Sequence, residues 1–278
     1  MTLSTQRVFH YDGSLNDISK SMNDINSNSE ALTIAATDYI YIGSDLPFNH
    51  RWFQVASANA ATATWTVEVW DGSAWVAAVD IVDYSEAAGV PLAADGIIKF
   101  TPDRNKSWAR ESTTEDIPSL STLKVYELFW IRLQPSAELS VTLNYIGFKF
   151  AQDDDLYGLY PELERTEIKT AFQTGKTDWD EQQVGASEEI VRYLKKKGIV
   201  WNGNQILDWE QFSVPNCHKV AEMVYFTFSG EDMEIKRKAA KNYYFTTVDV
   251  GIPRTDKDQD ARLDPQESKP YQTTLVRR

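Results

Sequence analysis

The chain has 278 residues, 42% of them hydrophobic, and a formal net charge of −13. A chain of this length usually forms about two domains, and its acidic balance excludes the basic footprint of a nucleic-acid-binding protein. No apolar run approaches the roughly 20 residues that a membrane helix needs. The N-terminal stretch lacks an apolar signal core, so we expect neither a membrane partner nor export by a signal peptide.

Residues 1–150 predict an all-β sandwich or jelly roll. Short runs rich in aromatic and β-branched residues alternate with turn signals such as Asp71-Gly72 and Pro102-Asp103, which is the spacing of such folds. The predicted strands cover 39–42, 52–55, 64–70, 97–101, 128–133 and 141–150.

The stretch 64–76, TWTVEVWDGSAWV, raises the question of what its tryptophans are for. Because strand side chains alternate, Trp65 shares a face with Val67 and should point into the core. Trp70 lies on the opposite face and Trp75 follows the turn, so these two could be presented outward. Packing is the favoured role of the tryptophans. The alternative makes Trp70 and Trp75 a platform on which sugar rings stack.

Residues 151–176 predict a linker, and residues 177–251 predict a small bundle of three helices. The linker opens on Asp153-Asp154-Asp155, a run of like charges that is typical of a solvated hinge. The first helix, over 177–197, ends in Lys195-Lys196-Lys197-Gly198. This ending places cations at the negative end of the helix dipole and a glycine at the C-cap.

The second predicted helix should begin near Val214, because Pro215 is tolerated only close to a helix start. The third follows Ser229 and ends before Gly251. The whole chain is therefore predicted to be an α+β multidomain protein: an N-terminal sandwich, a helical bundle, and an extended C-terminal arm over residues 252–278. The arm is too polar to fold alone, and its last residues would suit a strand added to a partner.

Catalytic and metal-binding patterns are weak in this sequence, so we expect no enzyme activity, metal or cofactor. His10, His50 and His218 are widely spread and fit no ligand spacing. Cys217 is expected to be a packed thiol. Five acids match the ligand spacing of an EF-hand calcium loop, but Ala261 occupies the position that needs glycine, so an acidic arm is favoured over a calcium site. The five acids are Asp256, Asp258, Asp260, Asp264 and Glu267.

Two groups of motifs resemble known virion proteins. The hairpin VEVWDGSAWV, the strand GIIKFTP at 96–102 and the strand YELFWIRL at 126–133 resemble jelly-roll modules in structural proteins of tailed bacteriophages. The helix ending EEIVRYLKKKG at 188–198, the short loop to Ile206-Leu207-Asp208, two more helices and a polar arm ending TLVRR resemble head–tail adaptor (connector) proteins of these phages.

The resemblance implies a structural virion protein located in the neck and made in the host cytoplasm. Such a protein forms a ring, expected here to be a dodecamer, under the portal protein and joins the capsid to a downstream neck or tail protein. DNA would pass through its channel without specific binding. The expected portal contacts are Tyr271, Leu275, Val276, Arg277 and Arg278 in the arm, with Lys195, Lys196 and Lys197 at the helix end.

Two alternatives to the adaptor stay open at this point. One is a carbohydrate-binding tail or baseplate protein for host-surface recognition, which would use Trp70 and Trp75. The other is a glycan hydrolase whose two carboxylates are brought together by folding.

Overall fold

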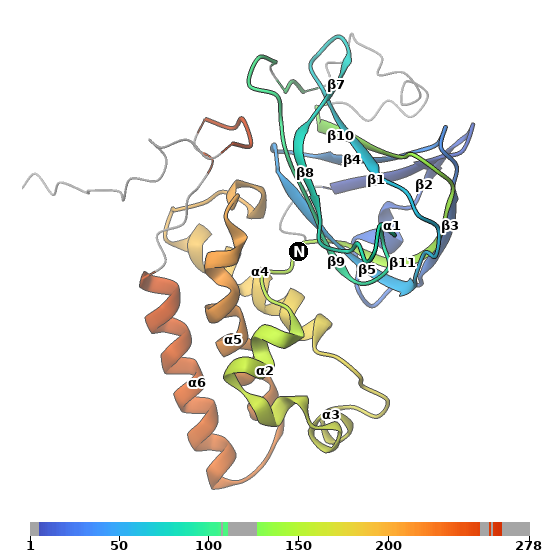
Figure 1. Cartoon of the computed structure of the whole chain (residues 1–278). Helices are drawn as coiled ribbons and strands as arrows, with labels where there is room; N and C mark the ends of the chain where they lie inside the picture. Colours follow the sequence, from blue (N-terminus) through green and yellow to red (C-terminus); the bar gives the residue numbers. More distant parts are fainter. Residues whose placement is uncertain (1–5, 107, 111–126, 251–255, 257, 263–278) are drawn as a thin grey trace, which may run out of the picture. The chain divides into compact units, whose positions relative to one another are not determined.

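The computed structural model describes residues 6–106, 108–110, 127–250, 256 and 258–262. The chain divides into two compact units. The first, here the β unit, comprises the chain up to Phe148 together with Asn202–Gln205 and Asp258–Arg262. The second, here the helical unit, comprises Lys149–Trp201 and the chain from Ile206 onward, apart from Asp258–Arg262. The predicted α+β class is confirmed: the described residues form eleven strands in two antiparallel sheets, followed by helices (Figure 1).

The β unit contains a six-stranded and a five-stranded sheet, in which every pairing between described strands is antiparallel. In order across the first sheet lie β2 (Leu15–Asp17), β1 (Gln6–Tyr11), β4 (Tyr39–Ser44), β10 (Phe129–Pro135), β6 (Trp65–Trp70) and β7 (Trp75–Ala77). In order across the second lie β3 (Glu30–Ile34), β11 (Leu139–Gly147), β5 (His50–Ser57), β9 (Gly96–Thr101) and β8 (Val79–Asp83). A short helix, α1 (Ser19–Met22), follows β2.

The six-stranded sheet buries large side chains on both of its faces. The Trp65 indole donates to Asp83 Oδ2 on β8 at 3.1 Å, so the face that carries Trp65 and Val67 looks toward the second sheet, as predicted. Alternation then turns Trp70 and Trp130 to the opposite face, yet both are buried there as well. Gly43 on β4 makes room for this layer, because a Cβ at that position would lie 2.6 Å from the Trp130 ring.

The helical unit begins earlier than the sequence indicates. Residues 151–176 were expected to be a linker, and that expectation was wrong for most of the segment. It forms α2 (Asp153–Leu159), the 3₁₀ turn η1 (Pro161–Glu164) and α3 (Thr166–Phe172). Asp153 and its two neighbours form the first turn of α2, where negative charge is favoured by the helix dipole.

Three longer helices complete the helical unit, close to their predicted positions. They are α4 (Asp180–Lys196), α5 (Ser213–Thr227) and α6 (Glu231–Val250), with the 3₁₀ turn η3 (Trp209–Phe212) before α5. Pro215 lies in the first turn of α5, where its missing N–H costs no helical hydrogen bond. Buried residues of α2, η1, α4, α5 and α6 share one hydrophobic core. Its members include Leu156, Leu163, Ala186, Val220, Val224 and Ala240.

Candidate functional site

The two candidate sugar-binding tryptophans do not form an open platform. The sequence left open whether Trp70 faces solvent, and the structure exposes only 4% of its surface. It packs with Phe9, Tyr41 and Trp130 in an aromatic cluster on the face of the six-stranded sheet that is turned away from the second sheet. Trp70 is buried because strand alternation places these large rings in one contiguous layer, a long-range property that a single hairpin does not reveal.

Trp75 is half-buried, and a neighbouring cation occupies its ring face. The Arg132 guanidinium carbon lies 4.8 Å from the centroid of the Trp75 ring and 4.5 Å from that of Tyr39. Arg132 also donates to Glu68 on the adjacent strand. Trp70 and Trp75 meet edge to face, with centroids 5.5 Å apart. The hairpin tryptophans are thus engaged with protein partners, which favours the packing interpretation.

The lysines that end α4 are exposed, as the sequence indicates, but they are not equivalent. Lys197 pairs with Asp249 in the last turn of α6, and the Tyr193 hydroxyl donates to the same carboxylate. These two hydrogen bonds hold the pKa of Asp249 below its usual range. Lys195 and Lys196 extend into solvent beyond this contact. The chain then reverses at Gly198, whose φ of +72° is the left-handed conformation of a helix C-cap.

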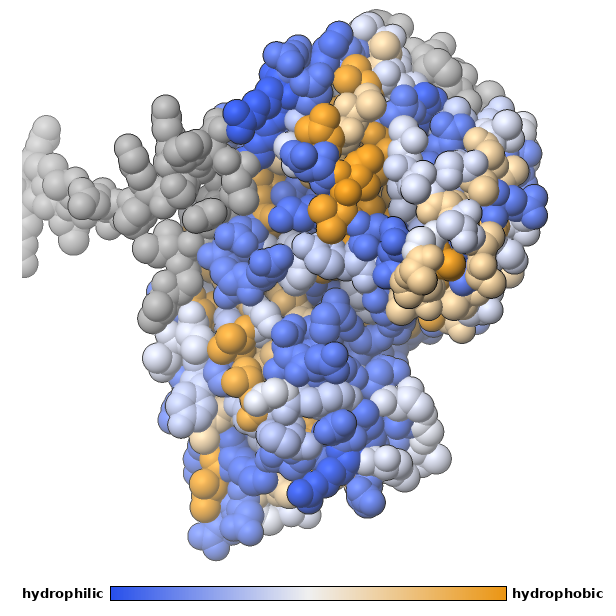
Figure 2. All heavy atoms as spheres, viewed as in Figure 1, coloured by the Kyte–Doolittle hydropathy of each residue, from blue (hydrophilic) through white to orange (hydrophobic). Residues whose placement is uncertain are grey.

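Large apolar side chains are exposed at several places on the helical unit, among hydrophilic neighbours (Figure 2). Trp201 is 77% exposed and Phe226, at the end of α5, is 74% exposed. Ile235, Tyr243 and Phe245 on α6 are exposed as well. Single exposed apolar residues are ordinary on a protein surface. Exposed aromatic rings close to charged side chains, however, have the composition of protein–protein contact sites.

The predicted arm is not extended throughout. Its portal-contact residues Tyr271, Leu275, Val276, Arg277 and Arg278 lie outside the described residues. Asp258–Arg262 instead belongs to the β unit, where Ala261 is 1% exposed. The Arg262 side chain donates to the carbonyl oxygens of Pro102, at 3.0 Å, and Asp103. The sequence contains no signal for this contact, because Arg262 recognises main-chain carbonyls and these have no sequence pattern.

The segment Asp258–Arg262 lines a polar cavity of about 320 Å³ on the β unit. The lining residues are Arg104, Asn105, Lys106, Trp108, Gln259, Asp260 and Arg262. The positive charges are partly compensated, since Lys106 lies 4.0 Å from Asp71 and Arg262 lies 3.6 Å from Asp260.

Three of the five candidate calcium ligands lie close together in the chain segment that precedes Ala261. Asp256, Asp258 and Asp260 each offer one carboxylate oxygen, and these oxygens lie within 4.8 Å of one another. Asp264 and Glu267 lie outside the described residues, so the structure assembles only the first part of the predicted loop. Local groups of exposed acids are common on protein surfaces without a bound ion.

His50 and His218 each contact a neutral partner. His50 Nδ1 lies 2.7 Å from Asn49 Oδ1, and burial holds the pKa of His50 well below its usual value. His218 Nδ1 lies 2.7 Å from the Tyr160 hydroxyl, and burial lowers the pKa of His218 as well. His10 is also buried. The contacts of His50 and His218 are what core histidines make.

Cys217 is fully buried on α5, and burial raises the pKa of its thiol to about 12. Since only the thiolate reacts, we expect a disulfide reagent at pH 8 to label the folded protein at least about a thousandfold more slowly than the unfolded chain. Stopped-flow labelling in buffer and in denaturant measures this ratio. Labelling of the folded protein at the unfolded rate would contradict the packed-thiol interpretation.

A buried cation in the β unit was not anticipated from the sequence. Arg51 on β5 is 1% exposed, and its guanidinium lies 3.5 Å from the Phe48 ring centroid and 4.6 Å from that of Phe148. It donates to Gln6 Oε1 at 2.7 Å and to Asn204 Oδ1 at 2.9 Å. Burial lowers the pKa of Arg51 to about 9. The network explains why Asn202–Gln205 belongs to the β unit although it follows α4 in the chain.

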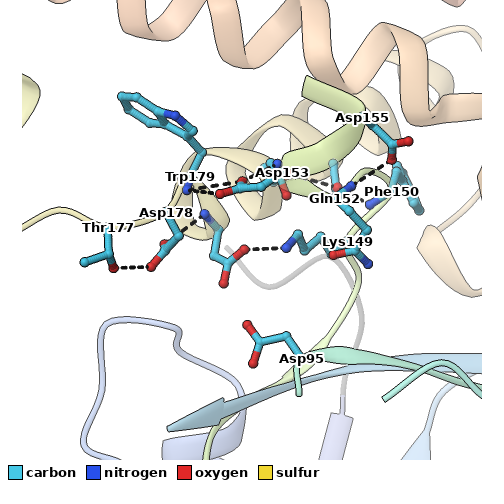
Figure 3. A network of polar contacts seen from close by, with 12 residues as sticks. Asp95, Lys149, Phe150, Gln152, Asp153, Asp155, Thr177, Asp178 and Trp179 are labelled. Carbon is cyan, nitrogen blue, oxygen red and sulfur yellow. Dashed lines mark hydrogen bonds and ion pairs between the residues drawn. The ribbon is translucent and has the colours of Figure 1, made fainter. Parts of the chain in front are cut away.

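A second buried network lies in the helical unit (Figure 3). Lys149 pairs with Asp180 at the start of α4, with both side chains nearly inaccessible. Asp153 accepts hydrogen bonds from the main-chain N–H of Trp179, at 3.3 Å, and from the Gln183 side chain, at 2.8 Å. Burial raises the pKa of Asp153. Asp153 therefore caps the contact between α2 and α4. The sequence had indicated that Asp153 belongs to a solvated hinge, and for this residue that interpretation was wrong.

Comparisons of the chain with protein-family models, with curated proteins and with solved structures gave no match. Within the described part of the chain, no helix has both the length and the hydropathy to cross a membrane. The function is therefore inferred from the surfaces of the molecule.

Proposed function

We propose that the chain is a non-enzymatic structural protein of a tailed-phage virion, a head–tail adaptor that forms a ring under the portal and joins the capsid to the tail. In this proposal the two sheets are a phage-type jelly roll, and α4, α5 and α6 form the adaptor bundle. The motif resemblance suggests this assignment. The exposed aromatic side chains of the helical unit are the observation that supports it best, because aromatic residues are enriched in protein–protein interfaces relative to the rest of a protein surface.

The charge of the chain suits a channel wall. A net charge of −13 on each subunit, repeated around a ring, would repel the phosphate backbone and let DNA pass without being retained. Contact with the portal falls to the arm in this proposal, and Arg262, the residue before its last segment, contacts Pro102 of the β unit. A downstream neck or tail protein would contact the opposite side of the ring.

Removal of residues 263–278 is expected to abolish capture of the portal protein. The shortened chain keeps Arg262 and its contact with Pro102, so both units should stay folded while the proposed portal contacts are lost. The measurement is affinity capture from a lysate of infected cells, with the bound proteins identified by mass spectrometry. The full chain should recover the portal and the shortened chain should not.

A matched control replaces Tyr271, Leu275 and Val276 by serine in the full-length arm. Its loss of portal capture would assign the contact to these side chains, and retention would assign it to the rest of the arm. Equal portal capture by the full and the 263–278-deleted chains would overturn the role of the arm. Recovery of tail-fibre or baseplate proteins without a portal would overturn the adaptor proposal.

A further inference from the structure

Strand β8 lies at one edge of the five-stranded sheet formed by the described residues, with β9 on its inner side. In the described part of the β unit, the large apolar side chains that are exposed all belong to β8 or to the residue after it. Val79 is 47% exposed, Val82 43% and Tyr84 52%. Figure 2 shows apolar atoms gathered in a stripe on the β unit, where Figure 1 draws β8. An apolar strand at a sheet edge is a template for pairing with a further strand.

A β-bulge blunts only the first half of β8. The register with β9 shifts between Val79 and Val82, and Asp80 has a φ of +51°. Bulges bend a strand and are one of the devices that keep sheet edges from pairing. Regular pairing resumes at Val82, which lies opposite Lys99. The second half of β8 therefore combines a regular strand with an exposed apolar side chain.

The described part of the C-terminal segment ends close to the start of β8. Arg262 donates to the main-chain carbonyl oxygens of Pro102 and Asp103. Pro102 directly follows β9, and Thr101, the last residue of β9, pairs with Val79 of β8. The residues after Arg262 therefore start within one arginine side chain of the strand next to β8.

The chain after Arg262 has the length and the composition of an added strand. Its sixteen residues would span about 50 Å when extended, whereas the five residues of β8 span about 17 Å. Residues 263–270 contain two prolines, which cannot donate to a ladder and suit a connection. Residues 271–276, with the sequence YQTTLV, are mostly aromatic, β-branched or apolar, as strand residues are.

We infer that residues 271–276 add as a strand to the outer edge of β8 in the same chain, the edge turned away from β9. Main-chain hydrogen bonds hold the added strand, and its apolar side chains cover Val79 and Val82. The tether at Arg262 gives the segment a local concentration on the order of millimolar at β8, which favours the chain's own segment over that of a second copy. The contact forms before the chain meets a portal, so it does not depend on the adaptor proposal.

Hydrogen–deuterium exchange of the purified full chain tests the pairing. The variant Y271S/L275S/V276S removes the apolar side chains of the added strand. Amides of residues 79–84 should then exchange at least about tenfold faster than in the natural chain, because the outer edge of β8 loses its partner. Peptides from β3, at the other edge of the same sheet, should exchange at the same rate in both chains.

The matched control is E267S/K269S, which changes the connection and keeps the net charge of the chain. Its β8 amides should exchange as slowly as those of the natural chain. Equal exchange of residues 79–84 in the natural chain and in Y271S/L275S/V276S would overturn the inference. So would a control as fast as that variant, since the effect would then not belong to residues 271–276.

A disulfide distinguishes the chain's own segment from that of a second copy. In V82C/T274C, oxidised glutathione should join the two new thiols within one chain, since the natural Cys217 is buried. The control S14C/T274C places the first thiol in the exposed turn before β2, at an edge of the other sheet. It should crosslink at least about tenfold more slowly. Non-reducing mass spectrometry identifies the products, and equal rates or links mainly between chains would overturn the inference.

The β8 contact and the adaptor proposal can fail separately, because exchange and crosslinking use the purified chain and portal capture uses a lysate. Where both hold, the segment leaves β8 to bind the portal, so oxidised V82C/T274C should capture the portal only after reduction. Protected β8 amides without portal capture would contradict the adaptor and keep the β8 contact. Portal capture by a chain whose β8 amides are unprotected would overturn the β8 contact and keep the adaptor.

Discussion

Replacing Arg51 by alanine is expected to lower the free energy of unfolding of the β unit by about 3 kcal/mol or more. The substitution removes a side chain that fills the space between Phe48 and Phe148. It also leaves the amide oxygens of Gln6 and Asn204 without the donor they now have. Each buried acceptor that loses its donor costs about 1–3 kcal/mol, and the cavity adds to that loss.

Urea unfolding monitored by tryptophan fluorescence measures the effect, because the β unit contains Trp52 and Trp130 in its interior. The matched variant is Arg51→Lys, which keeps the charge but cannot reproduce the forked donor geometry or the stacking of a planar guanidinium. Its stability should lie between those of the natural chain and the alanine variant. A loss under about 1 kcal/mol for Arg51→Ala would show that the network is unimportant for folding.

Breaking the Lys149–Asp180 pair on one side is expected to destabilise the helical unit by about 3–5 kcal/mol. Both side chains are nearly inaccessible, so Lys149→Met leaves a carboxylate in the interior and Asp180→Leu leaves an ammonium there. The double variant removes both charges together and should recover most of the loss, because two packed apolar side chains replace the pair.

The four proteins form a thermodynamic cycle that thermal or urea unfolding can complete. A large favourable coupling energy between the two positions is expected. The control is Lys238→Met on α6, whose pairing with Glu234 is exposed and should change stability little. A double variant as unstable as the sum of the single variants would contradict the account, since it would mean that the two charges act independently.

Local patterns predicted much of the fold. Alternation in the strand of Trp65 placed this ring against the second sheet, and Pro215 marked the start of α5 correctly. Both depend on neighbours within a few residues, for which strand and helix periodicity is informative. The burial of Trp70 on the outer face of the six-stranded sheet does not follow from any one strand, and for that reason the sequence left open whether this ring is exposed.

The buried charges could not be predicted, because their partners are remote in the chain. Arg51 reaches Gln6 across 45 positions and Asn204 across 153. Asp153 appears in the sequence as one of three like charges, and only the fold brings the N–H of Trp179 to it. The exposed end of α4 was predictable from Lys195-Lys196-Lys197, but its pairing with Asp249 on α6 was not.

Immunogold electron microscopy of virus particles purified from cells that produce this chain tests the adaptor proposal most directly. Antibodies raised against the purified full chain would locate it on the particle, with particles of an unrelated tailed phage as the control for background. Gold at the junction of capsid and tail is the result that the proposal predicts. Gold at the tail tip or baseplate, or particles that carry none of the protein, would contradict it.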